Sequence, residues 1–442
     1  MQSVRFFRKG MFDISEKPKL VEKAFLIGVF HTLVEKEESA SLLDELEALV
    51  ETLAIPVAKK QLIRVPEPSS RYFIGSGKAE EMAAQAHDLG ADVIVFDNEL
   101  QPAQQRNWEA LAKIAVIDRQ EIILDIFAQR AQTKEARLQV DLARLEYSLP
   151  RLTRAWGHLS RQAGGLGAKG EGETQLETDR RLVRKQIDRL KADLERVRSR
   201  RATQRKQRQR LPLPHAAIVG YTNAGKSSLL RRLTGAEVLV ENKLFSTLDP
   251  KTRRIDLEGG QKLLLTDTVG FVRNLPHRLV EAFKATLEEA TLADFLIHVL
   301  DASHPRVYDF HATTMRVLDE LGADTKRVVT LLNKVDRVED SSSLHALRLH
   351  FPDAVFGSAH TGQGMGELLH LCGEMLREWV TKVELALPLS RTELLSLLHR
   401  TSRVLSLNYD DRCANVVAMV SPKVYARVEP YLVRREPEFQ TA

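Results

Sequence analysis

The chain has 442 residues, 43% of them hydrophobic, and a formal net charge of +5. This length predicts several domains, and the hydrophobic content is sufficient for ordinary cores. The two cysteines, Cys372 and Cys413, provide neither a disulfide framework nor metal-ligand spacing, which favours a reducing compartment. We find no apolar run long enough to span a bilayer and no secretory signal. The sequence therefore predicts a cytoplasmic protein without stable membrane insertion.

The first 120 residues alternate between apolar stretches and amphipathic ones. This alternation predicts a small parallel α/β domain. The expected elements are strands at 24–30, 92–96 and 115–117 and helices at 39–53, 78–89 and 103–112.

Within this region, the run Gly75-Ser76-Gly77-Lys78 resembles the end of a phosphate-binding loop. The leading glycine of such a loop would fall on Tyr72, however, and Ala79 follows the lysine where Ser or Thr is required. We interpret the run as a tight turn before a helix. Weak contact with a nucleotide or with RNA phosphates is the alternative.

Two leucine-rich helices are expected between residues 121 and 210. Apolar residues recur there at steps of three and four, which is the spacing of an a/d seam. Joined by the intervening loop, the helices would form an antiparallel hairpin; the alternative is two amphipathic helices lying separately on a core. The seam residues are Leu138, Leu142, Leu145 and Leu149, followed by Val183, Ile187, Leu190, Leu194 and Val197.

The segment between these helices is basic, rich in glycine and carries a tryptophan. Glycines allow close backbone approach, and Arg, Lys and Trp side chains suit phosphates and bases. Seven basic residues and no acid then follow between Arg198 and Arg210. We favour contact with RNA phosphates over a merely solvated helix face. The RNA-binding residues expected near the tip are Arg151, Arg154, Trp156, Arg161 and Lys169.

Residues 220–227 match the G-x-x-x-x-G-K-[ST] pattern of a phosphate-binding loop. An apolar strand-like stretch precedes the pattern and a helical stretch follows it, as the motif requires. Backbone amides and the helix N-terminus would hold the phosphates. Lys226 is expected to reach the β- and γ-phosphates, and Ser227 to bind Mg²⁺. The nucleotide-binding residues expected here are Gly220, Tyr221, Thr222, Asn223, Ala224, Gly225, Lys226, Ser227 and Ser228.

Two further motifs follow apolar strands. Asp267 can hold Mg²⁺ through water, and the amide of Gly270 can sense the γ-phosphate. In 333–336 the carboxylate of Asp336 can accept two parallel hydrogen bonds from guanine, whereas adenine would leave it unpaired. The other nucleotide-binding residues expected in these motifs are Thr268, Val269, Asn333, Lys334 and Val335. Ser358 and Ala359 lie where a base-contacting loop is expected.

Together these motifs resemble the translation-factor-like class of P-loop GTPases, and two more segments resemble the HflX family. Residues 173–181, Glu-Thr-Gln-Leu-Glu-Thr-Asp-Arg-Arg, are nearly a signature of HflX proteins, and 244–250 are similar to their switch I. The chain departs from the family at 168–172, where Ala-Lys-Gly-Glu-Gly replaces the usual Thr-Arg-Gly-Pro-Gly. The resemblance covers nearly the whole chain. It implies that Phe245 and Thr247 belong to the nucleotide site, with Thr247 closing onto Mg²⁺.

The resemblance also implies residue roles, architecture and activity. The expected catalytic residues are Lys226, Thr247 and Gly270, and the expected metal ligands are Ser227, Thr247 and Asp267. The expected fold class is α/β: a P-loop GTPase domain with an N-terminal parallel α/β subdomain, a long antiparallel helical hairpin and a small C-terminal α+β domain. The domain boundaries expected are 1–120, 121–210, 211–383 and 384–442.

The expected activity is that of a monomeric, Mg²⁺-dependent GTPase that binds the large ribosomal subunit and its RNA and dissociates or rescues ribosomes under stress. Phe271 stands where Ras-like enzymes carry the glutamine that orients water, so intrinsic hydrolysis should be slow and stimulated by the ribosome. Asn223 either holds K⁺ or only shapes its loop. The alternatives are a nucleotide-dependent RNA-remodelling factor, a ribosome-assembly GTPase, or a scaffold with a degenerate pocket.

Overall fold

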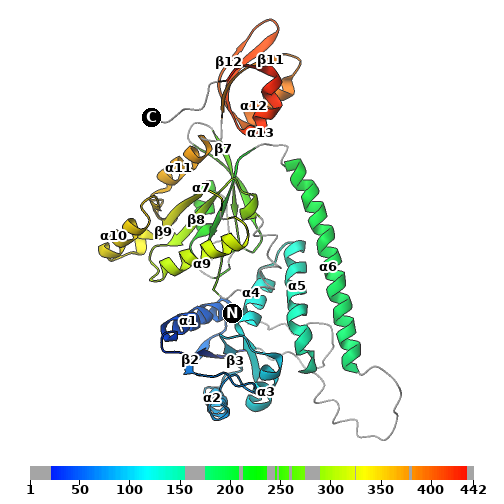
Figure 1. Cartoon of the computed structure of the whole chain (residues 1–442), viewed down its shortest axis with the longest axis vertical. Coiled ribbons are helices and arrows are strands. Elements are labelled where there is room, and N and C mark those ends of the chain that lie inside the picture. Colours follow the sequence, from blue (N-terminus) through cyan, green and yellow to red (C-terminus); the bar gives the residue numbers. More distant parts are fainter. Residues whose placement is uncertain are drawn as a thin grey trace. The chain divides into compact units, whose positions relative to one another are not determined.

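The computed structural model describes residues 21–154, 175–208, 213–235, 244–245, 248–257, 261–273, 289–323, 325–377 and 381–435. Their elements form three sheets, each with its own helices (Figure 1). The chain divides into two compact units. The first takes in Met1–Arg196 with two short later segments that include Leu244–Phe245 and Arg273, and the second takes in most of the rest.

The sheet of the first unit is parallel, with strand order β2-β1-β3-β4. Helices α2 and α3 pack on one face, where Met82 and Trp108 meet Phe25, Ile94 and Phe96. The predicted parallel α/β fold is confirmed. The strands are β1 Ala24–Phe30, β2 Val57–Arg64, β3 Val93–Phe96 and β4 Ala115–Asp118; the helices are α1 Lys36–Thr52, α2 Ser76–Asp88, α3 Pro102–Ala112 and α4 Arg119–Arg130.

The Gly75–Lys78 run forms the N-terminal end of a helix, whereas we expected a tight turn ahead of one. Helix α2 begins at Ser76, with Gly75 as its extended N-cap residue. The Lys78 ammonium pairs with the Glu81 carboxylate one turn along the same helix, at 2.7 Å. Strand β2 has no counterpart among the expected elements.

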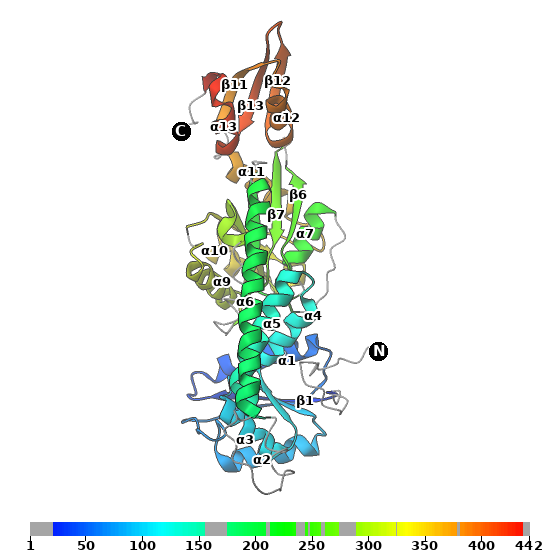
Figure 2. The same ribbon diagram turned by 90° about the vertical axis from the view of Figure 1, so that its right-hand side faces the viewer.

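The leucine-rich helices are α5, Lys134–Ser148, which continues into the 3₁₀ turn η1, Leu149–Arg154, and α6, Gln175–Arg208. They lie side by side in both views (Figures 1 and 2), and the Lys191 ammonium of α6 pairs with the Glu146 carboxylate of α5 at 2.8 Å. This contact favours the hairpin over two separate helices. On α6, Val183, Ile187 and Leu194 are buried, as the seam predicts.

Helix α5 differs from the expected single seam. Its most buried apolar residues are Ala136, Val140, Ala143 and Tyr147, whereas the predicted leucines are half-buried. Helix α5 contacts α4 as well as lying beside α6. A helix with two neighbours needs two apolar faces, and the face that carries Ala136, Val140, Ala143 and Tyr147 is the more deeply buried one.

The large sheet of the second unit has the order β10-β9-β8-β5-β7-β6 and is parallel except for β6. Helices α7 and α11 share a hydrophobic core with one face, and α9 contacts β5 and β8. The strands are β5 His215–Gly220, β6 Lys251–Asp256, β7 Lys262–Asp267, β8 Phe295–Asp301, β9 Val328–Asn333 and β10 Val355–Phe356; the helices are α7 Lys226–Thr234, α9 Val307–Glu320, α10 Ser341–His350 and α11 Met365–Arg377.

The last sheet is antiparallel, with the order β12-β13-β11-β14 and two helices packed on one face. Its first strand, β11, begins at Thr381, ahead of residue 384; the four domain boundaries remain a prediction. Cys413 opens β13 and is half-buried, whereas Cys372 of α11 lies in the core of the large sheet. The elements are β11 Thr381–Pro388, α12 Thr392–Thr401, β12 Arg403–Tyr409, β13 Cys413–Val420, α13 Pro422–Val428 and β14 Leu432–Arg435.

Candidate nucleotide-binding site

The phosphate-binding pattern lies where strand β5 ends and helix α7 begins. The backbone is left-handed at Asn223, with a φ of 60°, and at Gly225, with a φ of 100°. A Cβ atom on Gly225 would lie 2.2 Å from Asn333 Nδ2, so a side chain cannot be accommodated there. The sequence therefore forms the tight loop that the motif predicts, with the helix N-terminus directly behind it.

Lys226 is buried at the base of this loop. Its ammonium donates hydrogen bonds to the carbonyl oxygens of Gly220, at 3.1 Å, and Tyr221, at 2.8 Å. Desolvation lowers the pKa of Lys226 to about 8; the Asp267 carboxylate raises this pKa and the Lys334 charge lowers it. The lysine side chain is thus held within the loop. Its pKa, lowered to about 8, lies much nearer to neutral pH than that of an exposed lysine.

The two expected metal ligands that the structure describes are in direct contact. Ser227 Oγ donates a hydrogen bond to Asp267 Oδ2 at 2.7 Å, although 40 residues separate them. A hydroxyl and a carboxylate are hard oxygen donors of the kind that Mg²⁺ takes in nucleotide sites. The pair therefore fits a Mg²⁺ ion. In the described part of the chain, no group of three or more His, Cys, Asp or Glu side chains could hold a metal ion by itself.

The segment after β7 lies against the phosphate-binding loop. A Cβ atom on Gly270 would lie 2.7 Å from Thr222 Cα and 2.9 Å from Lys226 Nζ, so only glycine fits. The Phe271 carbonyl accepts a hydrogen bond from the Thr222 amide at 2.8 Å, and the Phe271 amide donates one to the Gly220 carbonyl at 3.2 Å. The ring of Phe271 is 1% exposed. Phe271 therefore packs in the interior, as expected for an apolar side chain that cannot hydrogen-bond to water.

Asn333 joins three parts of the site. Its Nδ2 donates to the Ala224 carbonyl at 2.8 Å, and its Oδ1 accepts from the Ala359 amide at 2.9 Å. Ser358 is fully buried and its hydroxyl accepts hydrogen bonds from the two amides that follow Ala359. Asp336 is exposed at the surface. The phosphate-binding loop, the 333–336 motif and the 358–359 loop therefore meet at the carboxyl edge of one sheet, where α/β folds place their ligands.

Lys334 and Asp301 form a contact that motif reasoning did not anticipate. Lys334 Nζ lies 2.7 Å from Asp301 Oδ2 and donates to the Asn223 carbonyl at 2.8 Å. Asp301 ends the apolar strand β8. The sequence did contain an indication of this residue, because Asp301, like Asp267, stands at the end of an apolar stretch. No known motif includes Asp301, so it was not selected.

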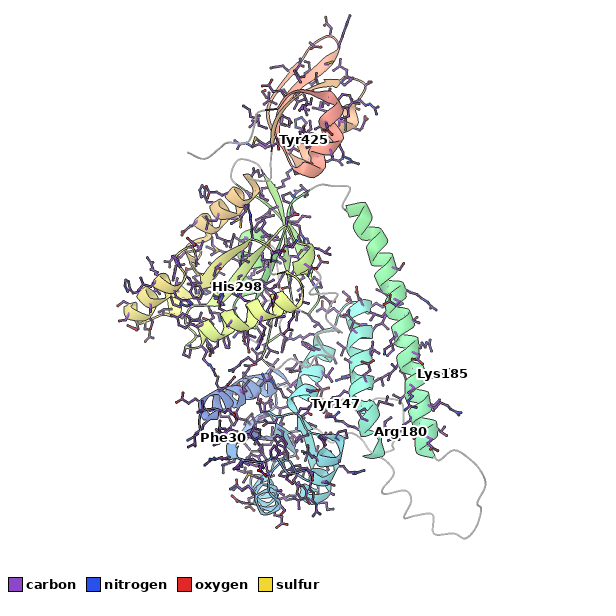
Figure 3. The ribbon with its side chains drawn as sticks, viewed as in Figure 1. Phe30, Tyr147, Arg180, Lys185, His298 and Tyr425 are labelled. Atoms are coloured by element: carbon purple, nitrogen blue, oxygen red, sulfur yellow. The ribbon has the colours of Figure 1, made fainter. Side chains whose placement is uncertain are left out.

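The ring of Tyr221 packs against helix α9. The ring stacks on Phe310 of α9 at 3.8 Å between centroids and is nearly parallel to it. The backbone carbonyl of Tyr221 is the part that serves the loop, as an acceptor for Lys226. The imidazole of His298 (Figure 3) is buried. It stacks on the ring of His311 of α9, with 5.2 Å between the ring centroids.

Some predicted residues lie elsewhere. Phe245 belongs to the first unit, where its ring packs edge-on against Phe127 at 4.7 Å and is 2% exposed. The ring of Phe245 thus packs in a hydrophobic contact. A role for Phe245 in nucleotide binding remains a prediction. Thr247, Trp156, Arg161 and Lys169 lie outside the described residues, and Arg154 is described only in its backbone.

The RNA contact expected of Arg151 is corrected by the structure. Its guanidinium donates to the Gln105 side chain at 2.9 Å and to the carbonyls of Leu100 and Tyr147, at 2.8 and 3.1 Å. It also stacks on the Tyr147 ring at 3.6 Å and faces the buried Asp118 carboxylate. Arg151 therefore stabilises the interior of the first unit. This structural role was not predicted, because the segment that begins at Arg151 is basic and suggested RNA binding.

Three family models match successive parts of the chain. They are described as the N-terminal region of a GTP-binding GTPase, at 40–128, its middle region, at 130–208, and a 50S ribosome-binding GTPase, at 215–334. The chain is 49% identical over 437 residues to the GTPase HflX of Akkermansia muciniphila, an alignment that covers 96% of this chain and 100% of that one. This chain belongs to the HflX family of GTPases.

A second relative agrees with this assignment. The GTPase HflX of Escherichia coli is 42% identical over 368 residues, covering 83% of this chain and 86% of that one. A crystal structure of SsGBP with GDP is similar over 80% of this chain and 98% of that one, with 26% identity and a TM-score of 0.47. As a member of the HflX family, the chain binds and hydrolyses GTP. In the described part of the chain, no helix is long and apolar enough to cross a membrane.

Proposed function

We propose that this HflX protein is a monomeric cytoplasmic GTPase that binds the large ribosomal subunit and couples GTP hydrolysis to ribosome dissociation or rescue. The observation that carries the proposal is the meeting of the phosphate-binding loop, Asp267 and the 333–336 motif at one sheet edge. The match of 215–334 to a 50S ribosome-binding GTPase supports the choice of partner. A stress-linked role follows from the family resemblance.

Within the site, Lys226 would contact the β- and γ-phosphates, and Ser227, Thr247 and Asp267 would hold Mg²⁺. The ion would neutralise phosphate charge when bound. Gly270 would sense the γ-phosphate, because it already lies against Lys226. GTP would thereby order the segments around Thr247 and Gly270, and hydrolysis would release them.

Ribosome binding would depend on the basic hairpin. We propose Arg154, Trp156, Arg161 and Lys169 as its RNA contacts, together with exposed cations such as Lys185, which projects from α6 (Figure 3). Each phosphate contact that is lost should weaken binding and flatten its dependence on salt. Unchanged affinity for large subunits after neutralisation of these residues would assign RNA binding to another surface.

GTP turnover with and without purified large subunits tests the proposal. We expect slow turnover of the protein alone and stimulation by the subunit, because Phe271 cannot orient water. Turnover that is fast alone and unaffected by subunits would contradict it. Unwinding of an RNA duplex without ribosomes would instead favour an RNA-remodelling factor, and stimulation by immature particles alone a ribosome-assembly GTPase.

Base and cation preference test the pocket itself. Lys226→Ala should abolish nucleotide binding or turnover. Asp336→Asn should relax the preference for guanine over other purines, and unchanged discrimination would remove Asp336 from the base pocket. Asn223 is exposed and its backbone is left-handed. We propose that it helps to hold K⁺ near the developing charge. Equal turnover in K⁺ and Na⁺ would leave Asn223 with a purely structural role.

A further inference from the structure

Asp301 lies between the two strands that carry the nucleotide motifs. Strand β8, which it ends, is hydrogen-bonded to β5 on one side and to β9 on the other. Asp301 is in register with Asn333, and the next amide, that of Ala302, donates to the Asn333 carbonyl at 2.8 Å. The carboxylate of Asp301 is therefore fixed at the sheet edge where the phosphate-binding loop and the base motif meet.

Both oxygens of this carboxylate have assigned partners. Oδ1 accepts hydrogen bonds from the backbone amide of Ser303, at 3.0 Å, and from its hydroxyl, at 2.6 Å. Oδ2 faces Lys334 Nζ at 2.7 Å. The turn after β8 thus orients the carboxylate, so that one oxygen is presented to the lysine in a fixed position.

The ion pair is largely protected from solvent. The side chains of Lys334 and Asp301 are 15% and 16% exposed. Charge-assisted hydrogen bonds in such an environment are stronger and less screened by salt than exposed pairs. The same ammonium donates to the Asn223 carbonyl at 2.8 Å, so it links Asp301 to the phosphate-binding loop.

Lys334 needs such a partner for two reasons. Its backbone is left-handed, with a φ of 63°, a conformation that residues other than glycine rarely adopt. Its long side chain also has many rotamers, and holding it in one costs conformational entropy. The contact with Asp301 offsets both costs and keeps the ammonium against the Asn223 carbonyl.

We propose that Asp301 is a positioning residue of the guanosine-nucleotide pocket, acting through Lys334 on the loop residue Asn223. Asp301 does not itself touch the nucleotide. It fixes Lys334, which lies between the base motif and the phosphate-binding loop. This inference rests on the proposed nucleotide pocket and adds a residue to it that lies outside every motif.

The first test is Asp301→Asn, which keeps an Oδ1 acceptor for Ser303 and removes the charge that faces Lys334. We expect the dissociation constant for GDP to rise about tenfold, as for the loss of one charge-assisted hydrogen bond. The single-turnover rate at saturating GTP should stay within about twofold, because no group that acts on the phosphates is lost. Asp309→Asn, which removes an exposed partner of Arg306, is the matched control and should leave both constants unchanged.

A double-mutant cycle separates positioning from general destabilisation. On a Lys334→Met background, Asp301→Asn should have no further effect on GDP affinity. Asp301→Glu, which restores the charge, should bind GDP more tightly than Asp301→Asn even if both lower the melting temperature. Independent effects of the two sites, or a fall in melting temperature with unchanged GDP affinity, would overturn the proposal.

The same titrations distinguish failure of this inference from failure of the pocket. If Asp336→Asn leaves the preference for GDP over xanthosine diphosphate unchanged, the assignment of the base pocket is wrong. If Asp336→Asn shifts that preference while Asp301→Asn leaves GDP affinity at the wild-type value, the pocket stands and only the role of Asp301 is refuted.

Discussion

Arg273 Nη2 lies 2.9 Å from Glu45 Oε2, although 228 residues separate the two in the chain. Both side chains are 8% exposed. Glu45 also pairs with Arg119, which in turn pairs with Asp97 at 2.7 Å. Burial holds the pKa of Asp97 above its usual range. Two arginines and two carboxylates thus form one buried network in the first unit, with Arg273 supplied by the segment that follows Phe271.

Removing one charge from this network should be costly. Glu45→Gln removes one buried carboxylate charge from both Arg119 and Arg273, and we expect the first unit to lose about 3 kcal/mol of unfolding free energy. Chemical denaturation measures this loss. Glu47→Gln is the control, because Glu47 lies on the same helix and pairs with Lys60 at the surface. Its cost should stay below about 1 kcal/mol. Equal costs for the two variants would refute the interpretation.

The lowered pKa of Lys226 predicts how nucleotide affinity depends on pH. Free Lys226 has a pKa of about 8, whereas bound phosphates would keep its ammonium charged. Below pH 8 the lysine is charged in both states, so GDP affinity should be constant. Above pH 8 binding must take up a proton, and affinity should fall by up to about tenfold per pH unit. Fluorescence titration with labelled GDP between pH 7 and 9 measures this.

Lys226→Arg serves as the control for this pH series, since its guanidinium stays charged throughout. The variant should bind GDP more weakly but with little change between pH 7 and 9. A wild-type affinity that does not change up to pH 9 would mean that Lys226 keeps its charge despite its burial.

Phe271→Ala should separate stability from chemistry. The ring is 1% exposed, so its removal leaves a cavity that should cost about 3 to 4 kcal/mol. The hydrolysis rate should change only modestly, because the hydrogen bonds from Phe271 to the phosphate-binding loop involve its backbone. Single-turnover hydrolysis at saturating GTP, below the melting temperature, measures the rate. Loss of hydrolysis with intact nucleotide binding would show that Phe271 has a direct role.

His298 should make the second unit sensitive to acid. Burial, and then the charges of His311 and Lys226, lowers the pKa of His298 to about 3. An unfolded histidine binds its proton near pH 6.5, so the stabilisation is complete above pH 6.5 and is lost as pH falls towards 3. Between pH 6.5 and 5 the wild type should lose about 2 kcal/mol that a His298→Phe variant keeps.

Denaturant titrations at pH 5, 6 and 7 measure this difference. Replacing the exposed His360 by Asn is the control and should leave the wild-type pH dependence intact. Parallel pH profiles for the wild type and His298→Phe would show that His298 takes up its proton in the folded state.

The nucleotide motifs could be located from the sequence because their chemistry is local. The loop at 220–227, the acid at Asp267 and the 333–336 motif each follow an apolar strand, and strands of a parallel sheet deliver such residues to one edge. Strand β2 was not predicted from the sequence because Lys59 and Lys60 interrupt its apolar pattern. Both lysines are exposed, and Lys60 pairs with acidic residues of α1.

Contacts between distant residues could not be foreseen in the same way. Arg151 was expected to bind RNA because its neighbours are basic, but its partners Leu100, Gln105 and Asp118 lie 33 to 51 residues away. The ring of Phe245 meets Phe127, which no local pattern indicates. Asp301 shows the same limit, since its contact with Lys334 becomes visible only once β8 is placed between β5 and β9.

The two cysteines have a practical consequence. Cys372 is 1% exposed, and burial raises the pKa of its thiol to about 12, whereas Cys413 is half-buried on β13. Maleimide dyes react with accessible thiolates. At neutral pH the folded, unmutated protein should therefore accept a single fluorophore, on the C-terminal sheet. A spectroscopist could follow that sheet during the proposed binding to ribosomes without engineering a labelling position.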